Sequence, residues 1–286
     1  MRIQKSFAIA CLLPVALVNQ LTAAASADKS QYTLFKPTPV ELMREMVSDQ
    51  AMFTLTPYTV DAGHFQWETD VLDYFHDRDR SDGADVLMTG WALGRMTLKA
   101  GLCDRVDLEA SFSAYSEFTT KDRMAGTKTV ARGFGNLSTQ FKLNLWGNEG
   151  GATALAVLPY VTFPTTQLTP GYKDYNGGIQ VPFLVRMPCG VRLGLMTGFD
   201  LSEDDANRVQ ASYVNGISLR GRLAGKLDGF AEFFTQVDQD TGVWSGTVNA
   251  GVAYQLTKNI EVQVGTTFGV HNDIDYNPYF GFSWRY

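Results

Sequence analysis

Beyond residue 18, the sequence has no run of about twenty apolar residues, the length that a membrane-spanning helix requires. Histidine and cysteine are also scarce, with three of each in 286 residues, and the formal net charge is −6. A nucleic-acid partner would require a basic patch, so this class of partner is excluded. No two histidines have metal-ligand spacing within one folded element, so we expect neither a metal nor a cofactor.

The first 27 residues have the composition of a secretory signal. Arg2 and Lys5 precede an apolar run from Phe7 to Val18, and Ala25-Ser26-Ala27 supplies the small residues that a signal peptidase reads. We therefore expect residues 1–27 to be removed by cleavage before Asp28. The mature chain would then carry a formal charge of −6 − 2 = −8, because the signal contains two basic residues and no acid.

Glycine, with 27 residues, and aromatic residues, at 12%, are plentiful, and the C-terminus shows how they are used. From Phe280 to Tyr286 an aromatic residue occupies every second position, with Gly281, Ser283 and Arg285 between them. A period of two predicts a β-strand. A terminal aromatic on an apolar strand face is typical of the last strand of an outer-membrane barrel, where it lies in the interfacial girdle. The alternative is the last strand of a soluble β-sandwich.

The same alternation divides the rest of the chain into strands. With the C-terminal stretch as the twelfth, the expected strands lie at about 59–77, 84–100, 105–115, 133–146, 153–163, 177–187, 191–201, 209–222, 226–237, 244–256 and 260–270. The patterns of the second, fifth and eighth strands do not fix their registers. Their connections alternate between short ones, such as 102–104, and long polar ones, such as 116–132.

Tight turns at one end and long loops at the other are typical of outer-membrane barrels, whose termini both lie in the periplasm. We therefore predict an all-β fold over residues 57–286: a transmembrane antiparallel up-and-down β-barrel of about 12 strands in the cell outer membrane. Pairing of the first strand with the last closes the sheet and removes every edge from lipid.

Residues 28–56 do not have the pattern of a strand. After Pro37 and Pro39, apolar residues recur at helical spacing, which predicts a short amphipathic helix from about Val40 to Val47. This N-terminal segment either lies in the periplasm or plugs the lumen. A mobile tail is the remaining alternative.

The two cysteines of the mature chain fall in turns that the predicted topology separates. Cys103 follows the second strand and Cys189 follows the sixth. Four tilted strands would separate them by roughly 20 Å, whereas a disulfide requires Cα atoms within about 7 Å. We expect both residues to remain thiols.

If the apolar faces of the strands meet lipid, their polar faces meet the lumen. The predicted pore-lining residues are Glu68, Asp70, Glu109, Gln140, Lys142, Arg186, Arg192, Arg220 and Glu232. The resulting hypothesis is a polar channel for passive diffusion of small solutes, whose acidic and basic walls bias which solutes pass. The alternative is a structural barrel whose charges pair across a narrow lumen and fill it.

An enzyme would need a different arrangement. A lipid-cleaving barrel places a serine, a histidine and an orienting residue on its lipid face near the outer rim. In the predicted registers, His76 and His271 both fall on the lumen side, and His64 lies low in the first strand. The sequence contains no such trio, so we predict that the protein is not an enzyme.

Several phrases in the sequence resemble one known family. They are Pro57-Tyr58-Thr59-Val60-Asp61-Ala62-Gly63-His64-Phe65-Gln66, Lys142-Leu143-Asn144-Leu145-Trp146-Gly147-Asn148, Phe163-Pro164-Thr165, Gly177-Gly178 followed by Pro182, and Glu232-Phe233-Phe234. Together they resemble the outer-membrane proteins catalogued as transporters of the meta-pathway of phenol degradation, over about residues 57–286.

The resemblance implies a β-barrel that takes up aromatic or other small organic compounds. The candidate lumen aromatics are Tyr74, Phe230 and Phe234. The expected partners are outer-membrane lipid and lipopolysaccharide, a small-molecule solute, and the barrel-assembly machinery, which would act through the C-terminal strand.

Overall fold

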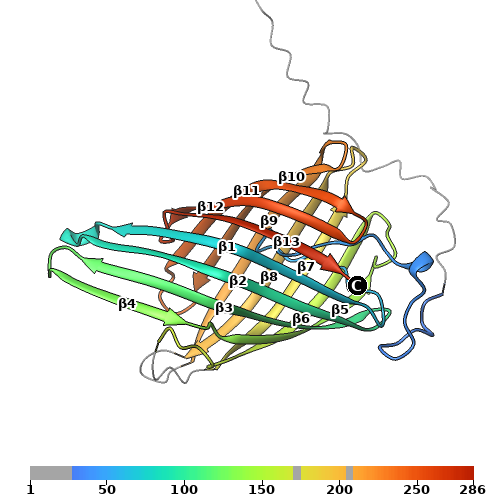
Figure 1. Ribbon diagram of the computed structural model, residues 1–286, viewed down its shortest axis with the longest axis horizontal. Helices are drawn as coiled ribbons and strands as arrows, with labels where there is room; N and C mark the ends of the chain where they lie inside the picture. The colour runs from blue at the N-terminus through green and yellow to red at the C-terminus, as the bar shows by residue number, and fades with distance from the viewer. Residues whose placement is uncertain (1–27, 170–174, 204–208) are drawn as a thin grey trace, which may run out of the picture.

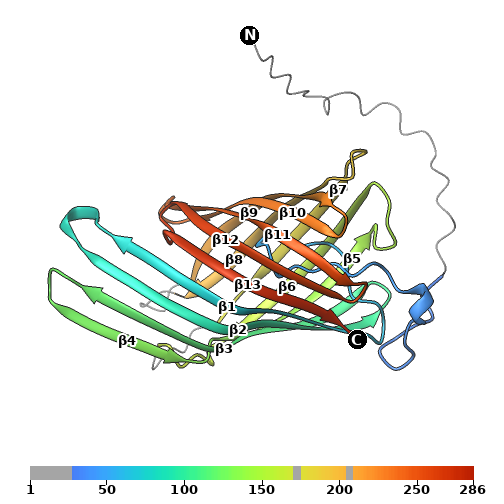
Figure 2. The ribbon, with the colours of Figure 1, turned by 45° about the horizontal axis from the view of Figure 1, so that its top comes forward.

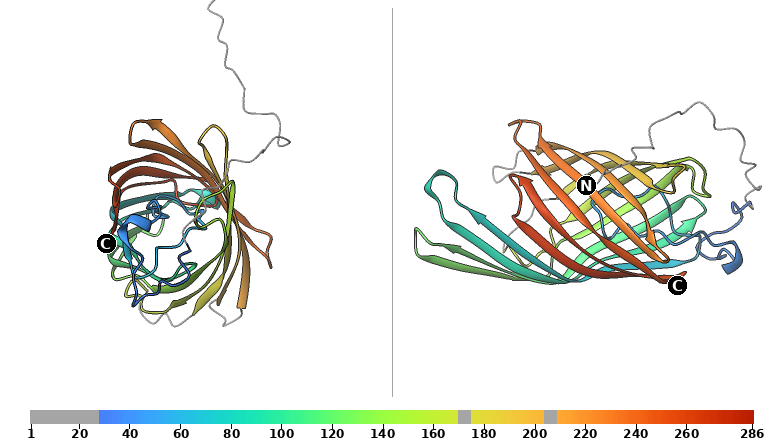
Figure 3. Two further views of the ribbon diagram at one scale, coloured as in Figure 1. Left: turned by 90° about the vertical axis from the view of Figure 1, so that its right-hand side faces the viewer. Right: turned by 90° about the horizontal axis from the view of Figure 1, so that it is seen from above.

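The computed structural model describes residues 28–169, 175–203 and 209–286, without the side chains of residues 82 and 203. Its strands form one antiparallel sheet that closes on itself (Figure 1; Figure 3, left). Closure occurs at β1 (Phe65–Asp79), which pairs with β2 (Val86–Cys103) on one side and with β13 (Tyr276–Arg285) on the other. The predicted signal, residues 1–27, lies outside the described residues.

The other strands follow one another around the barrel. They are β3 (Val106–Asp122), β4 (Thr127–Gly133), β5 (Leu137–Trp146), β6 (Thr153–Phe163), β7 (Asn176–Arg186), β8 (Arg192–Glu203), β9 (Val209–Ala224), β10 (Leu227–Asp238), β11 (Trp244–Thr257) and β12 (Ile260–His271). Both β4 and β5 pair with β3, one above the other. The thirteen strands therefore occupy twelve positions around the ring, which confirms the predicted twelve-stranded up-and-down barrel.

The two ends of the barrel differ as the loop lengths predict. The end that holds the C-terminus carries tight turns, such as 104–105 and 258–259. We call it the periplasmic end and the other the extracellular end, because outer-membrane barrels have their short turns on the periplasmic side. One expectation was wrong, because the stretch 116–132 is not a loop. It is the outer part of β3 together with β4, joined by the turn at 123–126. Polar residues occupy both faces of this hairpin, so the alternation that marks a membrane strand is missing there.

Outward-facing apolar side chains alternate with buried inward ones along the strands. In β13, Phe280 and Trp284 are exposed, whereas Tyr279 and Ser283, the residues that precede them, are buried. β6 differs because its inward residues Ala154, Ala156 and Leu158 are also apolar and fully buried. This explains why alternation alone could not fix the register of that strand.

The pairing between strands is interrupted at four neighbouring positions, which lie at one height on the barrel wall and which we call the break row. They are Val71 of β1, Gly94 of β2, Ala114 of β3 and Gly135 between β4 and β5, each opposite the next. None of the four forms a ladder pair. Gly94 has φ +61°, a left-handed conformation that L side chains rarely adopt. Beyond this row β1 stays paired with β13 as far as His76 and Tyr276, and the hairpins β1–β2 and β3–β4 then extend past the ends of β12 and β13 (Figure 2).

The row of breaks also reverses which residues face inward. Asp70 and Asp73 are both buried, although they are three positions apart in β1, while Val71 and Leu72 between them are exposed. His76 consequently lies on the outer face, where its ring stacks on Tyr276 with centroids 4.8 Å apart. The predicted lumen-facing orientation of His76 was therefore wrong, because sequence alternation assumed an unbroken strand.

The expected helix is also shorter than predicted. Only a single 3-10 turn, η1 (Val40–Leu42), forms, and Met43 is already extended. The backbone N–H of Arg44 donates to the Asp61 carboxylate rather than to a helical carbonyl. A second 3-10 turn, η2 (Ser81–Gly83), lies in the β1–β2 loop.

Two further expectations concern the cysteines and the possibility of a membrane-spanning helix. Cys103 and Cys189 are both thiols, as predicted. Within the described ranges, no helix is long and apolar enough to cross a membrane.

Candidate functional site: the barrel lumen and the segment inside it

Residues 43–62, which we call the lumen segment, run inside the ring of strands (Figure 3, left). The segment contacts widely separated parts of the wall. Ser48 Oγ lies 2.6 Å from Ser283 Oγ of β13, the Ala51 carbonyl accepts from Asn249 of β11 at 2.7 Å, and the Pro57 carbonyl accepts from Asn144 of β5 at 2.8 Å. These contacts span the lumen from one side to the other.

The lumen segment has no regular secondary structure, so wall carboxylates accept hydrogen bonds from its backbone. Asp49 N donates to Glu68 Oε2 at 3.1 Å, and Val60 N donates to Asp107 Oδ2 at 2.9 Å. Glu232 accepts from two successive amides, those of Phe53 and Thr54. Buried backbone N–H groups require acceptors, and the barrel supplies them from acids on three different strands.

Five charged side chains meet where the lumen segment crosses the barrel, and we call them the ion cluster. Asp49 Oδ2 lies 2.5 Å from Lys99 Nζ and 2.7 Å from Lys142 Nζ. Lys99 Nζ lies 2.9 Å from Glu68 Oε1, and Lys142 Nζ lies 3.0 Å from Glu109 Oε1. All five side chains are buried. Breaking such a buried pair costs much more than breaking a surface one, because the remaining charge is left without a counterion.

Asp49 is the only member of the ion cluster that belongs to the lumen segment. Burial alone would raise the pKa of this carboxyl group, but the ammonium groups of Lys142 and Lys99 outweigh burial. The pKa of Asp49 therefore lies well below its usual value. The segment is consequently held by a charge that stays ionised at neutral pH.

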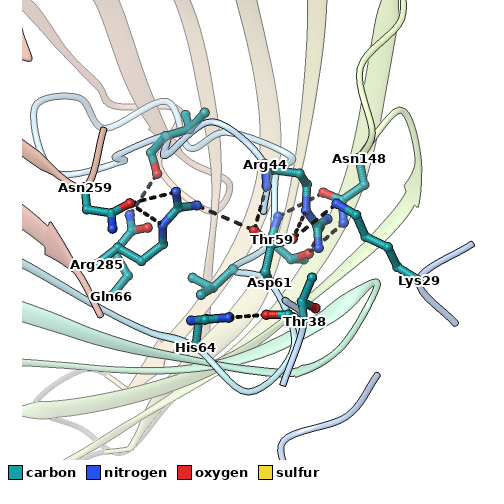
Figure 4. A network of polar contacts seen from close by, with 12 residues as sticks. Lys29, Thr38, Arg44, Thr59, Asp61, His64, Gln66, Asn148, Asn259 and Arg285 are labelled. Atoms are coloured by element: carbon teal, nitrogen blue, oxygen red, sulfur yellow. Dashed lines mark hydrogen bonds and ion pairs between the residues drawn. The ribbon is translucent and has the colours of Figure 1, made fainter. Parts of the chain in front are cut away.

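A second set of contacts fixes the segment at the periplasmic mouth, and Figure 4 shows it. The fully buried carboxylate of Asp61 lies 2.9 Å from Arg44 Nε, 3.4 Å from Lys29 Nζ and 3.5 Å from Arg285 Nη1. Nearby, His64 Nε2 lies 2.7 Å from the Thr38 carbonyl oxygen. One acid thus joins the N-terminal region, the lumen segment and the last strand.

A third charged group lies on the wall formed by β8, β9, β10 and β12. Arg220 contacts Asp228 at 3.2 Å and Glu261 at 2.5 Å, and Arg192 also reaches Asp228 at 3.2 Å. Among the described residues, no group of three histidine, cysteine or acidic side chains could hold a metal ion.

The nine predicted pore-lining residues come from seven of the strands and differ in environment. Glu68, Asp70, Glu109, Lys142, Arg220 and Glu232 are buried, Gln140 and Arg192 are half-buried, and Arg186 is exposed. Gln140 donates to Glu109 at 2.5 Å, and Arg186 lies over the Tyr58 ring. Whether these residues line a path for solutes stays a prediction.

Sequence reasoning missed several residues of this site. Asp49 and Asp61 were not selected because the segment that carries them has no pattern relating it to the wall. Lys99 was missed because the break at Gly94 obscured the register of β2. An available signal was the pairing of buried-strand lysines with acids at adjacent inward positions, as in Lys99 opposite Glu109.

Cavities lie on both sides of the ion cluster. On the extracellular side, a cavity of about 270 Å³ is lined by residues that include Phe53, Arg95 and Phe234. On the periplasmic side, another of about 270 Å³ is lined by residues that include Arg44 and Arg186. Lys99 borders both cavities, so the ion cluster stands between them.

Comparison with known proteins agrees with the fold. A family model described as "Putative MetA-pathway of phenol degradation" matches residues 48–286. The structure resembles the COG4313 outer membrane channel from Pseudomonas putida F1, with a TM-score of 0.54 and 14% identity, covering 78% of this chain and 93% of that one. It also resembles the β domain of the Bordetella autotransporter BrkA, with a TM-score of 0.51 and 11% identity, covering 78% and 99%. No curated protein matches the sequence.

Proposed function

The chain belongs to the family whose description is "Putative MetA-pathway of phenol degradation", and we propose that it is an outer-membrane channel for the passive diffusion or uptake of small organic solutes. We propose further that the lumen segment closes this channel from inside. The solute enters from the extracellular side and passes when the segment leaves its place on the wall.

The observation that carries the proposal is the pair of cavities separated by the ion cluster. A barrel that serves only as a structural element has no need of open space on both sides of a narrow closure. Here the closure consists of a segment without regular structure, held by side-chain contacts to the wall. Such a segment leaves without unfolding the barrel, because the strands keep their own ladder of hydrogen bonds.

The lumen wall supports organic solutes over sugars. From β6 to β10 the buried inward side chains include the apolar Leu158, Met196, Val214 and Phe230, beside the charged Arg220, Asp228 and Glu232. The opposite arc carries charged and hydroxyl residues, such as Arg95 and Ser111. A passage that carries both apolar and polar side chains suits molecules that have both kinds of surface.

The geometry around His76 supports a channel over an enzyme. Its ring stacks on Tyr276, and its Nδ1 lies 3.2 Å from Asp275. A lipid-cleaving site needs a serine hydroxyl within hydrogen-bond reach of the histidine, and in the described part of the chain His76 contacts Tyr276 and Asp275 instead. Hydrolysis of phospholipid by the purified protein, lost in His76→Ala, would contradict this part of the proposal.

Planar-bilayer recording tests the proposal directly. The full mature chain is compared with a variant lacking residues 28–56, which retains every strand. We expect rare or small conductance steps for the full chain and large, frequent steps for the deletion variant. Heat-modifiable migration shows whether the deletion variant is folded. If it is folded and neither protein shows conductance, the result would instead support the sealed structural barrel.

A further inference from the structure

The outward face of β1, β2 and β3 is apolar and then aromatic beyond the break row. Leu72, Leu93 and Tyr115 lie side by side in register next to the break, and Tyr74 and Trp91 form the following row. The Trp91 and Tyr115 rings have centroids 5.2 Å apart. Tyr74 lies on this outward face and not in the lumen. Apolar residues followed by an aromatic girdle mark the place where lipid tails give way to headgroups.

Nearer the tip of the β3–β4 hairpin, the same face carries two lysines that lie directly opposite each other. Lys121 of β3 pairs in register with Lys128 of β4, and both side chains are exposed. Lys121 is on the same face of β3 as Glu117, the register partner of Trp91, and lies farther from the break row. Figure 2 shows this hairpin extending beyond neighbouring strands. We call the two residues the lysine pair.

The acids near the lysine pair already have partners. Asp85 lies 2.8 Å from Arg78 Nε and 4.0 Å from Arg123 Nη1. Asp122 accepts from two backbone N–H groups of its own turn, at 2.9 Å each. Across the described ranges of the chain, neither lysine of the pair forms an ion pair with an acid. Their ammonium groups therefore have no counterion in the part of the protein that the structure describes.

The position of the lysine pair is unfavourable in the protein alone, because like charges at directly paired positions destabilise strands. Lysine on a free sheet edge prevents unwanted pairing, and this explains Lys128, since β4 pairs with β3 only. It does not explain Lys121, because β3 is also paired there with Leu87 of β2. By contrast, Arg132 of β4 lies opposite the acid Glu117. The lysine pair is therefore placed for an anion from outside the chain.

The sequence around the lysine pair has the same sign of charge. Residues 121–132 contain four basic residues and one acid, a formal charge of 4 − 1 = +3, although the whole chain carries −6. The loops after β10 and β12 instead carry acids, such as Asp240 and Asp273. An anion at the extracellular end is thus attracted to the β3–β4 side of the barrel.

We propose that the lysine pair binds a phosphate group of lipopolysaccharide, the phosphorylated glycolipid of the outer leaflet. Directly paired residues have Cβ atoms about 5 Å apart, so both ammonium groups reach oxygens of one phosphate and form charge-assisted hydrogen bonds. The acyl chains of the same lipid lie along Leu72 and Leu93, and its sugars meet Trp91. A soluble phosphate compound would use the lysines alone, whereas a lipid uses every row of this face.

This site lies on the outside of the barrel, so it is independent of the path of solutes through the lumen. Binding of the lipid removes the repulsion between the two lysines and thereby stabilises the hairpin in its extended position. The structure thus assigns the hairpin a lipid-binding role that does not depend on whether the channel is open.

Native mass spectrometry of the purified mature protein in detergent, titrated with diphosphorylated lipid A, tests the site. We expect the double variant Lys121→Gln, Lys128→Gln to bind this lipid about tenfold more weakly, because two cations at the headgroup level are lost. The matched control Lys226→Gln, Lys258→Gln removes the same charge from exposed lysines at the periplasmic end. This control should bind lipid A as the unmodified protein does.

Two results of this titration would overturn the proposal. One is an equal loss of binding in both double variants. The other is equal binding of lipid A with and without its phosphates. Displacement of lipid A by inorganic phosphate at the same concentration would overturn the assignment to a lipid.

Hydrogen exchange at the β3–β4 amides of Lys128→Gln distinguishes a lipid site from a structural role. In detergent alone we expect slower exchange than in the unmodified protein, because the like-charge contact is removed. With diphosphorylated lipid A the order should reverse, because only the unmodified hairpin gains the phosphate. Faster exchange in both conditions would show that Lys128 is merely structural, and slower exchange in both would show that the lysines only repel. Either result would contradict the proposal.

Discussion

The two halves of the lumen differ in what their inward residues meet. In the periplasmic half, Glu68, Lys142 and Glu232 face inward and are buried against the lumen segment. In the extracellular half, Arg95 and Phe53 border an open cavity, and the hairpins beyond the break row extend past the ends of β12 and β13 (Figure 2). The same strands run through both halves. An inward orientation therefore does not determine whether a side chain meets water or protein.

Charged side chains have different roles in the two halves of the lumen. In the periplasmic half, acids bind backbone amides and ammonium groups of fixed partners, as in the contacts of Glu232 and Asp49. Selectivity can then arise only where side chains remain accessible, above the ion cluster. Perturbing the closed half should change whether the channel opens, and perturbing the open half should change what it admits.

The largest expected effect comes from Asp49→Asn. This change leaves Lys99 and Lys142 with one counterion fewer in a buried site, and should weaken docking of the lumen segment by about 3 to 5 kcal/mol. Open probability in planar bilayers and tryptic cleavage after Arg44 should both rise. Asp28→Asn is the control, because that exposed carboxylate caps only Ser30. A variant that remains closed would show that the ion cluster does not hold the segment.

Glu232→Gln should have a smaller effect in the same direction. It weakens two hydrogen bonds from successive backbone amides to a charged acceptor, each worth about 1.5 to 3 kcal/mol. Hydrogen exchange at the Phe53 and Thr54 amides measures the loss. Glu117→Gln on β3, outside the lumen segment's contacts, should leave that exchange unchanged. Equal protection from hydrogen exchange in Glu232→Gln and the unmodified protein would show that the Glu232 carboxylate does not hold these two amides.

How much of the fold and of the candidate site could be predicted from the sequence depends on whether a residue meets lipid or other parts of the protein. The lipid face was predictable, as in β13, because lipid demands apolar side chains at every second position. The break row was not, because Gly94 and Ala114 are ordinary strand residues whose significance appears only when they align across strands. The ion cluster was hidden too, since Asp49 reaches its partners through a segment with no repeating pattern.

Lowering the pH should weaken docking of the lumen segment, by an amount that depends on the Asp49 pKa shift. Docking lowers the pKa of Asp49 below its value in the released segment, so the docked state is stabilised above about pH 4 and loses this stabilisation as pH falls further. Open probability should rise between about pH 4 and pH 3. Lys99, Lys142, Glu68 and Glu109 face the same carboxylate, so Asp49→Asn serves as the reference. It should lack the part of the response that Asp49 causes, and an identical response in both proteins would refute this assignment.

The smallest effect should come from the extracellular half. Gly94→Ala places a side chain at φ +61°, which costs about 1 to 2 kcal/mol. The barrel should unfold at lower urea concentration, as followed by tryptophan fluorescence, while the lumen segment stays docked and open probability stays unchanged. Increased opening in this variant would show that the two halves are coupled.

The most direct test of closure by the lumen segment introduces Ser48→Cys and Ser283→Cys into a mature chain that carries Cys103→Ser and Cys189→Ser. Conductance is recorded in one bilayer before and after reduction. Oxidation fixes the segment to β13 at a point where the native hydroxyl oxygens are 2.6 Å apart. The account predicts no conductance steps while the bond is intact and their appearance after a reductant is added. Steps of equal size and frequency in both states would contradict it.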